Sequence, residues 1–154
     1  MQADKIIMDV EKIKTLIPQR FPLLLIDTVH EIIENEKILA SKLLSADEPV
    51  FAGHFPGNPI YPGVYYIESI AQAGAVLLFS SNPSTIGMTG LLAGVEQVRF
   101  RRPCKPGDRV KFEVILEKKR GMFFWLKGKA FVGDEIAAEV KFSVALLPAE
   151  KSTK

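Results

Sequence analysis

Two side chains able to transfer protons, His54 and Glu68, occur in one stretch of the chain, residues 53–79, which reads GHFPGNPIYPGVYYIESIAQAGAVLLF. Histidine gains and loses a proton near neutral pH and is well suited to act as a general base, and a carboxyl group can serve as its partner acid. Each residue also has a structural alternative. His54 could be a hydrogen-bonded structural residue, and Glu68 could reach a solvated edge of its element.

The residue types around these side chains predict a loop followed by a helix. Residues 53–62 are crowded with Gly and Pro, which favour a loop. Residues 63–79 contain no proline and are apolar almost throughout, which indicates a helix. Glu68 and Gln72 are four residues apart and share one face of that helix. The rest of its surface is apolar on every side, as is typical of a helix buried all round, so the carboxylate needs a partner.

The expected start of this helix supplies a third chemical group. Pro62 suits the first helical position, and Gly63 follows it. The first N–H groups of a helix have no partner within it and carry a positive partial charge. A base, a sheltered carboxyl group and aimed N–H groups are the parts needed to remove a proton beside a carbonyl group.

Size and composition indicate an ordinary globular protein. The 154 residues suit a single domain, residues 1–154; 47% are hydrophobic, 25% are charged, and the net charge of +2 is too small to argue for nucleic acid. One cysteine and two histidines allow neither an internal disulfide nor an ordinary zinc site, so no metal is expected. The apolar run 64–79 is short and is interrupted by Glu68 and Gln72, so no membrane span is expected. With no apolar signal segment at the N-terminus, these features favour a cytoplasmic protein.

The remaining pattern predicts one short helix and about six strands. Asp9 is a candidate cap for a helix over residues 10–16. Strands are expected over residues 23–33, 37–44, 90–102, 109–117, 122–132 and 136–146. The alternation in residues 110–116 and 136–146 is clean, whereas residues 90–102 would place Leu92, Gly94, Val98 and Phe100 inward.

These elements predict an α+β fold in which a curved antiparallel sheet wraps around the long helix. Strands joined by short turns pair antiparallel, and a helix that is apolar all round must be covered on most sides. One sheet leaves the other flank of the helix uncovered. The sequence therefore also predicts a dimer.

Three blocks of sequence resemble the (3R)-3-hydroxyacyl-[acyl-carrier-protein] dehydratases of FabZ type, which have the hot-dog fold. Residues 17–27, IPQRFPLLLID, resemble the family's opening PHR[YF]PFLLVD. Residues 53–64, GHFPGNPIYPGV, continued to Glu68 and Gln72, resemble its active-site block. The third block is VRFRRP at residues 98–103 with PGD at residues 106–108. The three blocks occur in the family's order and extend over most of the chain.

The resemblance implies a reaction and roles for four residues. The family removes water from a 3-hydroxyacyl thioester in fatty-acid biosynthesis and gives the trans-2-enoyl thioester. No cofactor takes part, and the substrate is carried on the phosphopantetheine arm of acyl carrier protein. Carried over to this sequence, His54 takes the C2 proton, Glu68 helps the C3 hydroxyl leave, and the Gly63 N–H binds the thioester oxygen. Gln72 either orients Glu68 or a water, or is a buried hydrogen-bonding spacer.

In the family, the His and the acid come from different subunits. The resemblance therefore implies a homodimer with shared sites, alone or as a trimer of dimers. The related dehydratase/isomerase type carries Asp at the acid position, so Glu68 favours simple dehydration.

Two departures from the family pattern concern the neighbourhood of the site. Position 19 is Gln where the family usually has His, which lies outside the catalytic pair. Tyr61, Tyr65 and Tyr66 replace mostly aliphatic residues. They either narrow or polarise the acyl tunnel or pack with their hydroxyls hydrogen-bonded. The residues expected along that tunnel are Phe55, Tyr61, Pro62 and Tyr65.

Positive charge is concentrated in residues 99–111, where an acidic carrier protein could dock. The candidate docking residues are Arg99, Arg101, Arg102 and Lys105. The alternative is a solvated strand face whose arginines pair with acids elsewhere. Nucleic acid is not expected, because the aromatic residues of these strands alternate inward.

Two other functions fit the same fold. A hot-dog thioesterase would direct water at the thioester carbonyl. A non-catalytic subunit would only bind carrier protein or another hot-dog chain, although the joint presence of His54, Glu68 and Gly63 argues against it.

Overall fold

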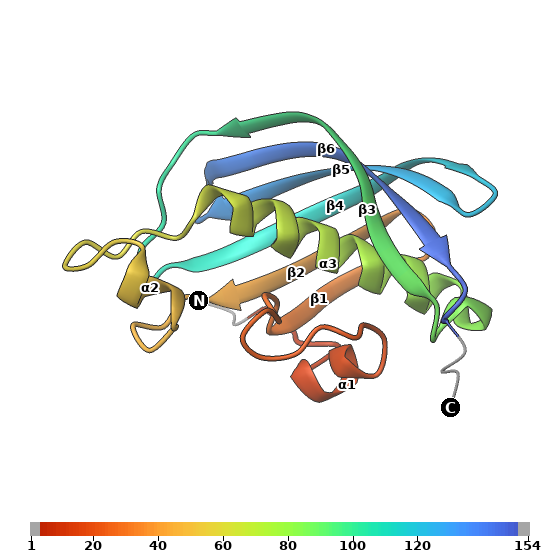
Figure 1. Ribbon diagram of the computed structural model, residues 1–154, viewed down its shortest axis with the longest axis horizontal. Coiled ribbons are helices and arrows are strands. Elements are labelled where there is room, and N and C mark those ends of the chain that lie inside the picture. Colours follow the sequence, from red (N-terminus) through yellow and green to blue (C-terminus); the bar gives the residue numbers. More distant parts are fainter. Residues whose placement is uncertain (1–3, 151–154) are drawn as a thin grey trace.

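The computed structural model describes residues 4–150, which form one long helix and a six-stranded sheet with three short helical segments (Figure 1). The helical elements are α1 (Val10–Lys14), α2 (Val50–Gly53), α3 (Gly63–Ser81) and the 3-10 helix η1 (Pro83–Thr85). The strands are β1 (Thr28–Ile33), β2 (Lys37–Leu43), β3 (Thr89–Phe100), β4 (Arg109–Arg120), β5 (Phe123–Val132) and β6 (Glu135–Leu147).

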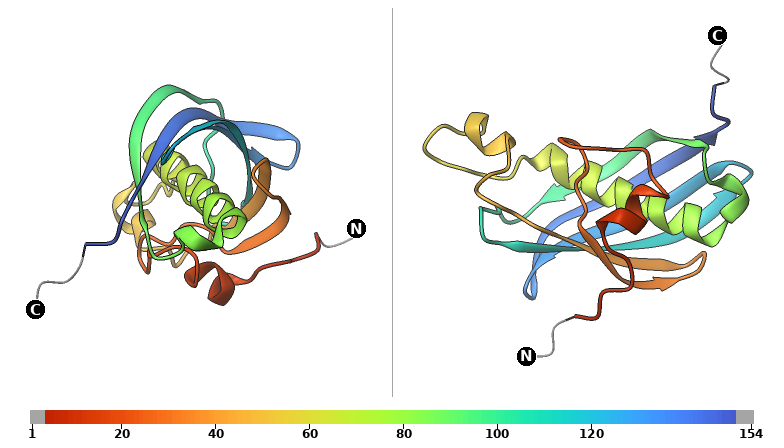
Figure 2. Two further views of the ribbon diagram at one scale, coloured as in Figure 1. Left: turned by 90° about the vertical axis from the view of Figure 1, so that its right-hand side faces the viewer. Right: turned by 90° about the horizontal axis from the view of Figure 1, so that it is seen from below.

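The sheet curls around α3, as Figure 2 shows along the helix axis. Its strand order is β1-β2-β4-β5-β6-β3, and every neighbouring pair is antiparallel. β3 returns after α3 to lie beside β6, so β1 and β3 form the two edges. The predicted α+β architecture is confirmed.

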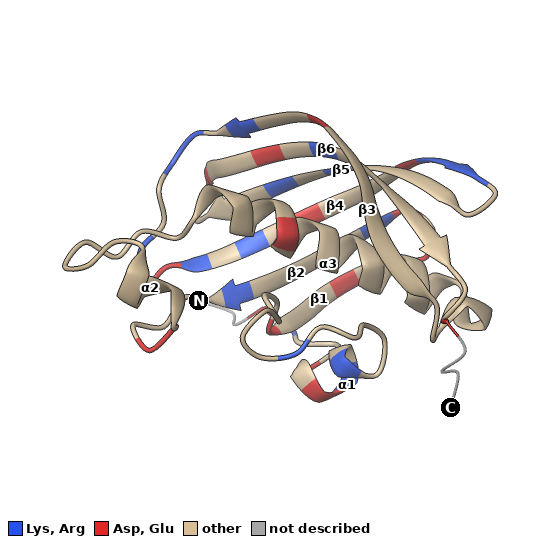
Figure 3. Cartoon of the chain, viewed as in Figure 1, with Lys and Arg blue, Asp and Glu red and all other residues tan. Residues whose placement is uncertain are grey.

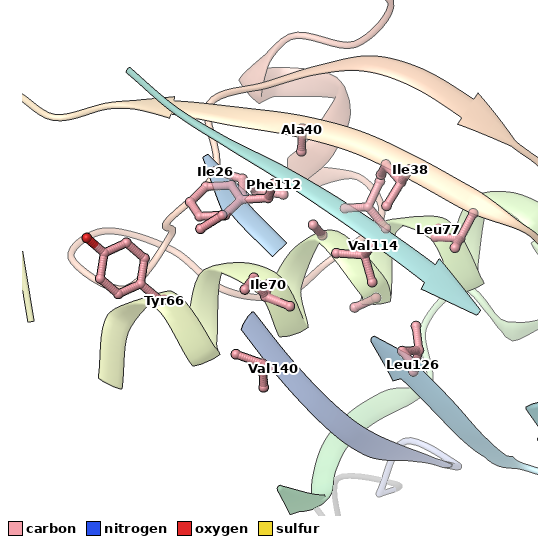
Figure 4. Close-up of a cluster of buried hydrophobic side chains, with 14 of the residues drawn as sticks. Ile26, Ile38, Ala40, Tyr66, Ile70, Leu77, Phe112, Val114, Leu126 and Val140 are labelled. Carbon is pink, nitrogen blue, oxygen red and sulfur yellow. The ribbon is translucent and has the colours of Figure 1, made fainter. Parts of the chain in front are cut away.

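The core lies between α3 and the inner face of the sheet. Figure 4 shows Ile70 and Leu77 of α3 among side chains of the surrounding strands, including Val114, Leu126 and Val140. All five are buried. The alternation predicted for β4 and β6 is confirmed, because the even-numbered residues 110–114 and 138–146 face this core.

The second half of α3 is buried all round, as expected, but the first half is open on one face. Every residue from Ala73 to Phe79 is buried. Val64, by contrast, is 65% exposed, and Tyr65, Ile67 and Glu68 are partly exposed. The uncovered part of the helix is therefore its N-terminal half, which carries Glu68.

The strand predicted over residues 23–33 is too long, because β1 begins only at Thr28. Gln72 of α3 explains the difference. Its Oε1 accepts a hydrogen bond from the Leu25 N–H at 2.9 Å, and its Nε2 donates to the Leu23 carbonyl at 2.7 Å. A buried helix side chain thus takes the place of a neighbouring strand for this segment.

The inward set predicted for residues 90–102 is confirmed except at Gly94. Leu92, Val98 and Phe100 lie opposite the buried β6 residues Val144, Val140 and Ala138, whereas Gly94 lies opposite Ser143. Leu92 and Phe100 nevertheless remain 43% and 53% exposed. Two register shifts in the β3–β6 pairing, between Leu92 and Gly94 and between Val95 and Gln97, break the two-residue period. β3 therefore presents apolar side chains to solvent along an unpaired edge.

Two helix starts lie at or within one position of the predicted ones, and one short helix has no counterpart in the prediction. Asp9 caps α1, because its carboxylate accepts a hydrogen bond from the Lys12 N–H at 2.9 Å. α3 begins at Gly63, with Pro62 as its N-cap residue, one position from the expected start. The four-residue helix α2, which leads directly into His54, was not predicted.

The rate at which a reagent modifies Cys104 measures how readily the surrounding structure opens to solvent. It is free and completely buried, and burial raises the pKa of its thiol. We expect an aromatic disulfide reagent to modify the native protein at least about a hundredfold more slowly than the protein in denaturant. The absorbance of the released thiolate measures both rates, and equal rates would show that the region around Cys104 opens readily.

Candidate active site

His54 lies at the C-terminal end of α2, and its ring is fixed by a backbone carbonyl. Nδ1 is 2.7 Å from the Ile60 carbonyl oxygen. A carbonyl oxygen can only accept, so Nδ1 carries the hydrogen of the neutral ring and Nε2 keeps its lone pair. The ring is half-buried and stacks on Phe55, with 3.9 Å between ring centroids. His54 is therefore held in the tautomer that can accept a proton at Nε2.

The loop after His54 is organised by its own backbone hydrogen bonds. Phe55 and Asn58 exchange two of them, at 2.9 and 2.8 Å, and the Ile60 N–H donates to the His54 carbonyl at 3.0 Å. Gly57, between them, has a φ of 73°, a conformation that glycine adopts without strain. These backbone hydrogen bonds and the conformation of Gly57 reverse the chain and bring the Ile60 carbonyl to the imidazole of His54.

A buried lysine holds the chain on the other side of α2. Lys42 of β2 is only 6% exposed, and its ammonium group lies 2.7 Å from the Glu48 carboxylate and 3.8 Å from Asp27. The Glu48 carbonyl accepts a hydrogen bond from the Phe51 N–H at the start of α2. This ion pair therefore ties the segment that leads into His54 to the sheet, and no sequence motif had suggested it.

Glu68 projects from α3 and is oriented by Gln72. Gln72 is buried, and its Nε2 donates to Glu68 Oε1 at 2.9 Å as well as to Leu23. Gln72 therefore contacts both the Glu68 carboxylate and the backbone of the segment 23–25, so its hydrogen bonds are compatible with either of the two roles considered for it. Glu68 itself is half-buried and lines a small cavity of about 50 Å³.

The first turn of α3 leaves backbone N–H groups available beside an aromatic ring. The Gly63 N–H, at the first helical position, has no partner within the helix. A side chain at Gly63 would place its Cβ 3.1 Å from the Phe100 ring. The absence of a side chain lets that ring cover the start of the helix.

The tyrosines around this helix start differ in burial. Tyr61 and Tyr66 are each 2% exposed, and Tyr65 is half-buried. The Tyr61 hydroxyl donates to Ser69 Oγ at 3.1 Å, because Ser69 donates its own hydrogen to the Tyr65 carbonyl. Burial raises the pKa of the Tyr61 and Tyr66 phenols, so both stay neutral. Within one chain Tyr61 and Tyr66 pack in the core, which agrees with the packing alternative.

Of the four candidate docking residues near the end of β3, two form ion pairs with carboxylates of this chain. Arg101 pairs with Glu139 at 2.6 Å, and Arg102 is 3.2 Å from both Asp108 and Glu135. The hydrogen bond from Arg101 lowers the pKa of Glu139. Arg99 and Lys105 are exposed. Figure 3 shows both acidic and basic stretches on β6, the strand beside β3.

A larger hollow, of about 500 Å³, lies on the outer face of the sheet, away from α3. Its walls include Arg99, Lys127, Lys129, Glu139 and Lys141. None of the catalytic candidates lines it. Among the catalytic candidates, Glu68 lines the smaller cavity and Gly63 lies at the start of α3.

The structure brings some candidate residues together and not others. Glu68 contacts Gln72, and His54 contacts Phe55, whereas the described residues contain no hydrogen bond between His54 and Glu68. Among residues 4–150, no group of three potential metal ligands comes together, and no helix is long and apolar enough to cross a membrane.

A single long helix inside a curled antiparallel sheet, with an imidazole ahead of the helix and a carboxylate within it, defines a hot-dog-fold protein. The family model described as a FabA-like domain matches residues 17–141. The chain belongs to this family.

Similar proteins agree with the FabZ type inferred from the three blocks. A curated 3-hydroxyacyl-[acyl-carrier-protein] dehydratase FabZ from Koribacter versatilis is 43% identical over 148 residues, covering 96% of this chain and 95% of its own length. Another from Symbiobacterium thermophilum is 47% identical over 135 residues, covering 87% and 94%.

Among solved structures, the dehydratase heterocomplex ApeI:P from Xenorhabdus doucetiae contains a similar chain. Its TM-score is 0.77, with 18% identity over 90% of this chain and 91% of that one. At this identity, the likeness supports the fold alone.

Proposed function

We propose that this protein dehydrates (3R)-3-hydroxyacyl-[acyl-carrier-protein] to the trans-2-enoyl form in cytoplasmic fatty-acid biosynthesis, as one catalytic domain without a cofactor. The observation that carries the proposal is the His54 ring, fixed by the Ile60 carbonyl with Nε2 free to accept a proton. The names of relatives more than 40% identical over nearly the whole chain supply the reaction and the substrate.

In this mechanism, His54 Nε2 removes a proton from C2 of the acyl group. The electron pair of the broken C–H bond forms the C2=C3 double bond as the C3–O bond breaks. Glu68, in its acid form, gives its proton to the departing hydroxyl oxygen, which leaves as water. His54 then loses a proton to solvent and Glu68 gains one, which restores both groups.

The Gly63 N–H serves as the donor to the thioester oxygen while negative charge builds there. Its place at the start of α3 supports this role, because the donor is fixed before the reaction and the helix adds a positive partial charge. Phe55, Pro62 and Tyr65 are proposed to line the acyl tunnel. Tyr61 supports it from within the core.

Two substitutions at Gly63 test this donor. Gly63→Pro removes the N–H at a position where proline fits the helix, whereas Gly63→Ala adds a comparable Cβ against Phe100 and keeps the N–H. We expect kcat of the proline variant to be about a hundredfold below that of the alanine variant. Equal kcat values for the two variants would remove Gly63 from the mechanism.

We further propose that the working unit is a homodimer in which His54 and Glu68 of different copies face one substrate, alone or as three dimers. The unpaired edge of β3 supports this, with Leu91, Val95 and Phe100 each more than 40% exposed. Val64, on the open face of α3, lies in the same half of the helix as Glu68.

Mixing two variants that each keep only a small residual activity tests the shared site. After His54→Asn and Glu68→Gln chains exchange subunits, half of the dimers are mixed and each mixed dimer has one intact site. Activity is then expected to return to about a quarter of the wild-type value. No return of activity, with exchange confirmed by mass spectrometry, would place both residues in one chain.

An acidic carrier protein is proposed to dock on the exposed positive charge at the end of β3. Arg99 and Lys105 are available for it, whereas Arg101 and Arg102 would have to exchange their present carboxylate partners. Charge of this kind acts mainly on the rate of encounter, so KM for the carrier-bound substrate should depend on salt.

Hydration of an enoyl thioester by the purified protein tests the reaction class. Formation of the 3-hydroxy product supports the dehydratase. Release of free thiol would support a thioesterase instead, and binding of carrier protein without turnover would support a non-catalytic subunit.

A further inference from the structure

The cavity beside Glu68 is small and has a mixed lining. Its volume is about 50 Å³, which suits a water molecule, whose share of liquid volume is about 30 Å³. The polar residues in its wall come from two places in the chain, Gln19 in the loop after α1 and both Glu68 and Gln72 on α3. The apolar part of the wall consists of Ala71, Ala75, Gly90, Leu92 and Val144.

Gln19 brings a buried hydrogen-bond acceptor to this region. Its Oε1 is buried, and no described residue donates a hydrogen bond to it. The backbone at Gln19 is held in place, because the Arg20 guanidinium donates to the carbonyls of Gln19 and Ile17 at 2.8 and 2.9 Å. Buried acceptors without a donor are rare in folded proteins and often mark a site for water or for catalysis.

The hydrogen bonds of Gln72 leave one part of Glu68 available. Gln72 uses its Oε1 on Leu25 and its Nε2 on Leu23 and on Glu68 Oε1. Glu68 Oε2 is therefore the carboxyl oxygen left for another partner. The two residues of the cavity wall that each keep an oxygen without a hydrogen-bond partner are thus Glu68, at Oε2, and Gln19, at Oε1.

We propose that the cavity is the subsite of the water that the reaction releases or consumes, and that Gln19 is the residue that positions it. This inference depends on the proposed dehydration. In the dehydration direction, the C3 hydroxyl takes the proton of Glu68 as the C3–O bond breaks. The resulting water donates one hydrogen to Gln19 Oε1 and one to the Glu68 carboxylate. In the hydration direction, this water gives a proton to the Glu68 carboxylate as an oxygen electron pair forms the bond to C3. The C2=C3 electron pair then forms the bond from C2 to the proton that protonated His54 returns.

Three substitutions, two at Gln19 and one at Glu68, are used to test the subsite. Gln19→Leu removes the amide at similar size, and kcat for enoyl-thioester hydration is expected to fall about tenfold with KM within about twofold. Gln19→His introduces a ring nitrogen that can also accept, and it should keep kcat within about threefold of wild type. In a Glu68→Gln background, Gln19→Leu should have an effect of less than about twofold, because the two residues act on the same water.

A structural role for Gln19 predicts a different result. Loss of packing would lower the melting temperature and would lower kcat by the same factor in both backgrounds. A crystal structure of the wild-type protein provides the direct observation, a water within hydrogen-bond distance of both Gln19 Oε1 and Glu68.

The inference is overturned if kcat of Gln19→Leu stays within about twofold of wild type or if its effect is unchanged in the Glu68→Gln background. If the wild-type protein hydrates no enoyl thioester, the proposed function fails first, and the crystal structure still decides whether the cavity holds water.

Discussion

Replacing His54 with asparagine is expected to lower kcat for enoyl-thioester hydration about a thousandfold while leaving the fold intact. The asparagine amide nitrogen occupies nearly the position of Nδ1 and can still donate to the Ile60 carbonyl, which holds the loop closed. What the variant lacks is the Nε2 lone pair that accepts the C2 proton. Steady-state kinetics and thermal unfolding, measured on the same preparation, separate the two effects.

The second histidine of the chain provides the matched control. His30 lies in β1, where its ring nitrogens contact Ser41 Oγ at 2.8 Å and the Lys5 carbonyl at 3.1 Å. His30→Asn should therefore cost some stability and leave kcat within about twofold. A comparable loss of kcat in both variants would mean that neither imidazole takes part in the chemistry directly.

The candidate site could be predicted from the sequence where its residues are close together in the chain. The Gly and Pro content of residues 53–62 and the apolar run that follows placed His54 in a loop ahead of the helix and Glu68 within it. The expected sharing of a face by Glu68 and Gln72 is confirmed by their hydrogen bond. These inferences needed only local spacing and helix geometry.

The parts that could not be predicted depend on contacts between distant segments. Nothing in residues 23–26 indicates that Gln72 will bind their backbone, so the segment was predicted as a strand. Lys42 and Glu48 look like surface charges in the sequence, yet their ion pair is largely buried. On β3, the bulges moved Gly94 out of the predicted inward set, because the strand period depends on its pairing with β6.

Gly128→Ala is expected to lower the free energy of unfolding by about 3 kcal/mol, although the substitution adds only one methyl group. Gly128 lies on β5, and a Cβ there would come within 2.2 Å of Ile70 Cγ2 and 3.4 Å of Val114 Cγ2. Ile70 is fully buried on α3, and a β-branched side chain in a helix has one strongly preferred rotamer, so it cannot turn away. The helix must instead move off the sheet. Denaturant unfolding followed by circular dichroism measures the loss.

A compensating substitution shows whether this close approach of helix and sheet is the cause. Ile70→Ala removes the methyl group that the Cβ added at Gly128 would meet, so the double variant should be more stable than the sum of the single changes predicts, by at least about 1 kcal/mol. Gly53→Ala is the matched control, because no atom lies within 4 Å of its added Cβ, and its effect should stay within about 0.5 kcal/mol. Additive losses in the double variant would contradict the contact. Because Ile70 lies between Glu68 and Gln72 on α3, a helix that is displaced from β5 also displaces the acid, so Gly128→Ala should lower kcat as well as stability.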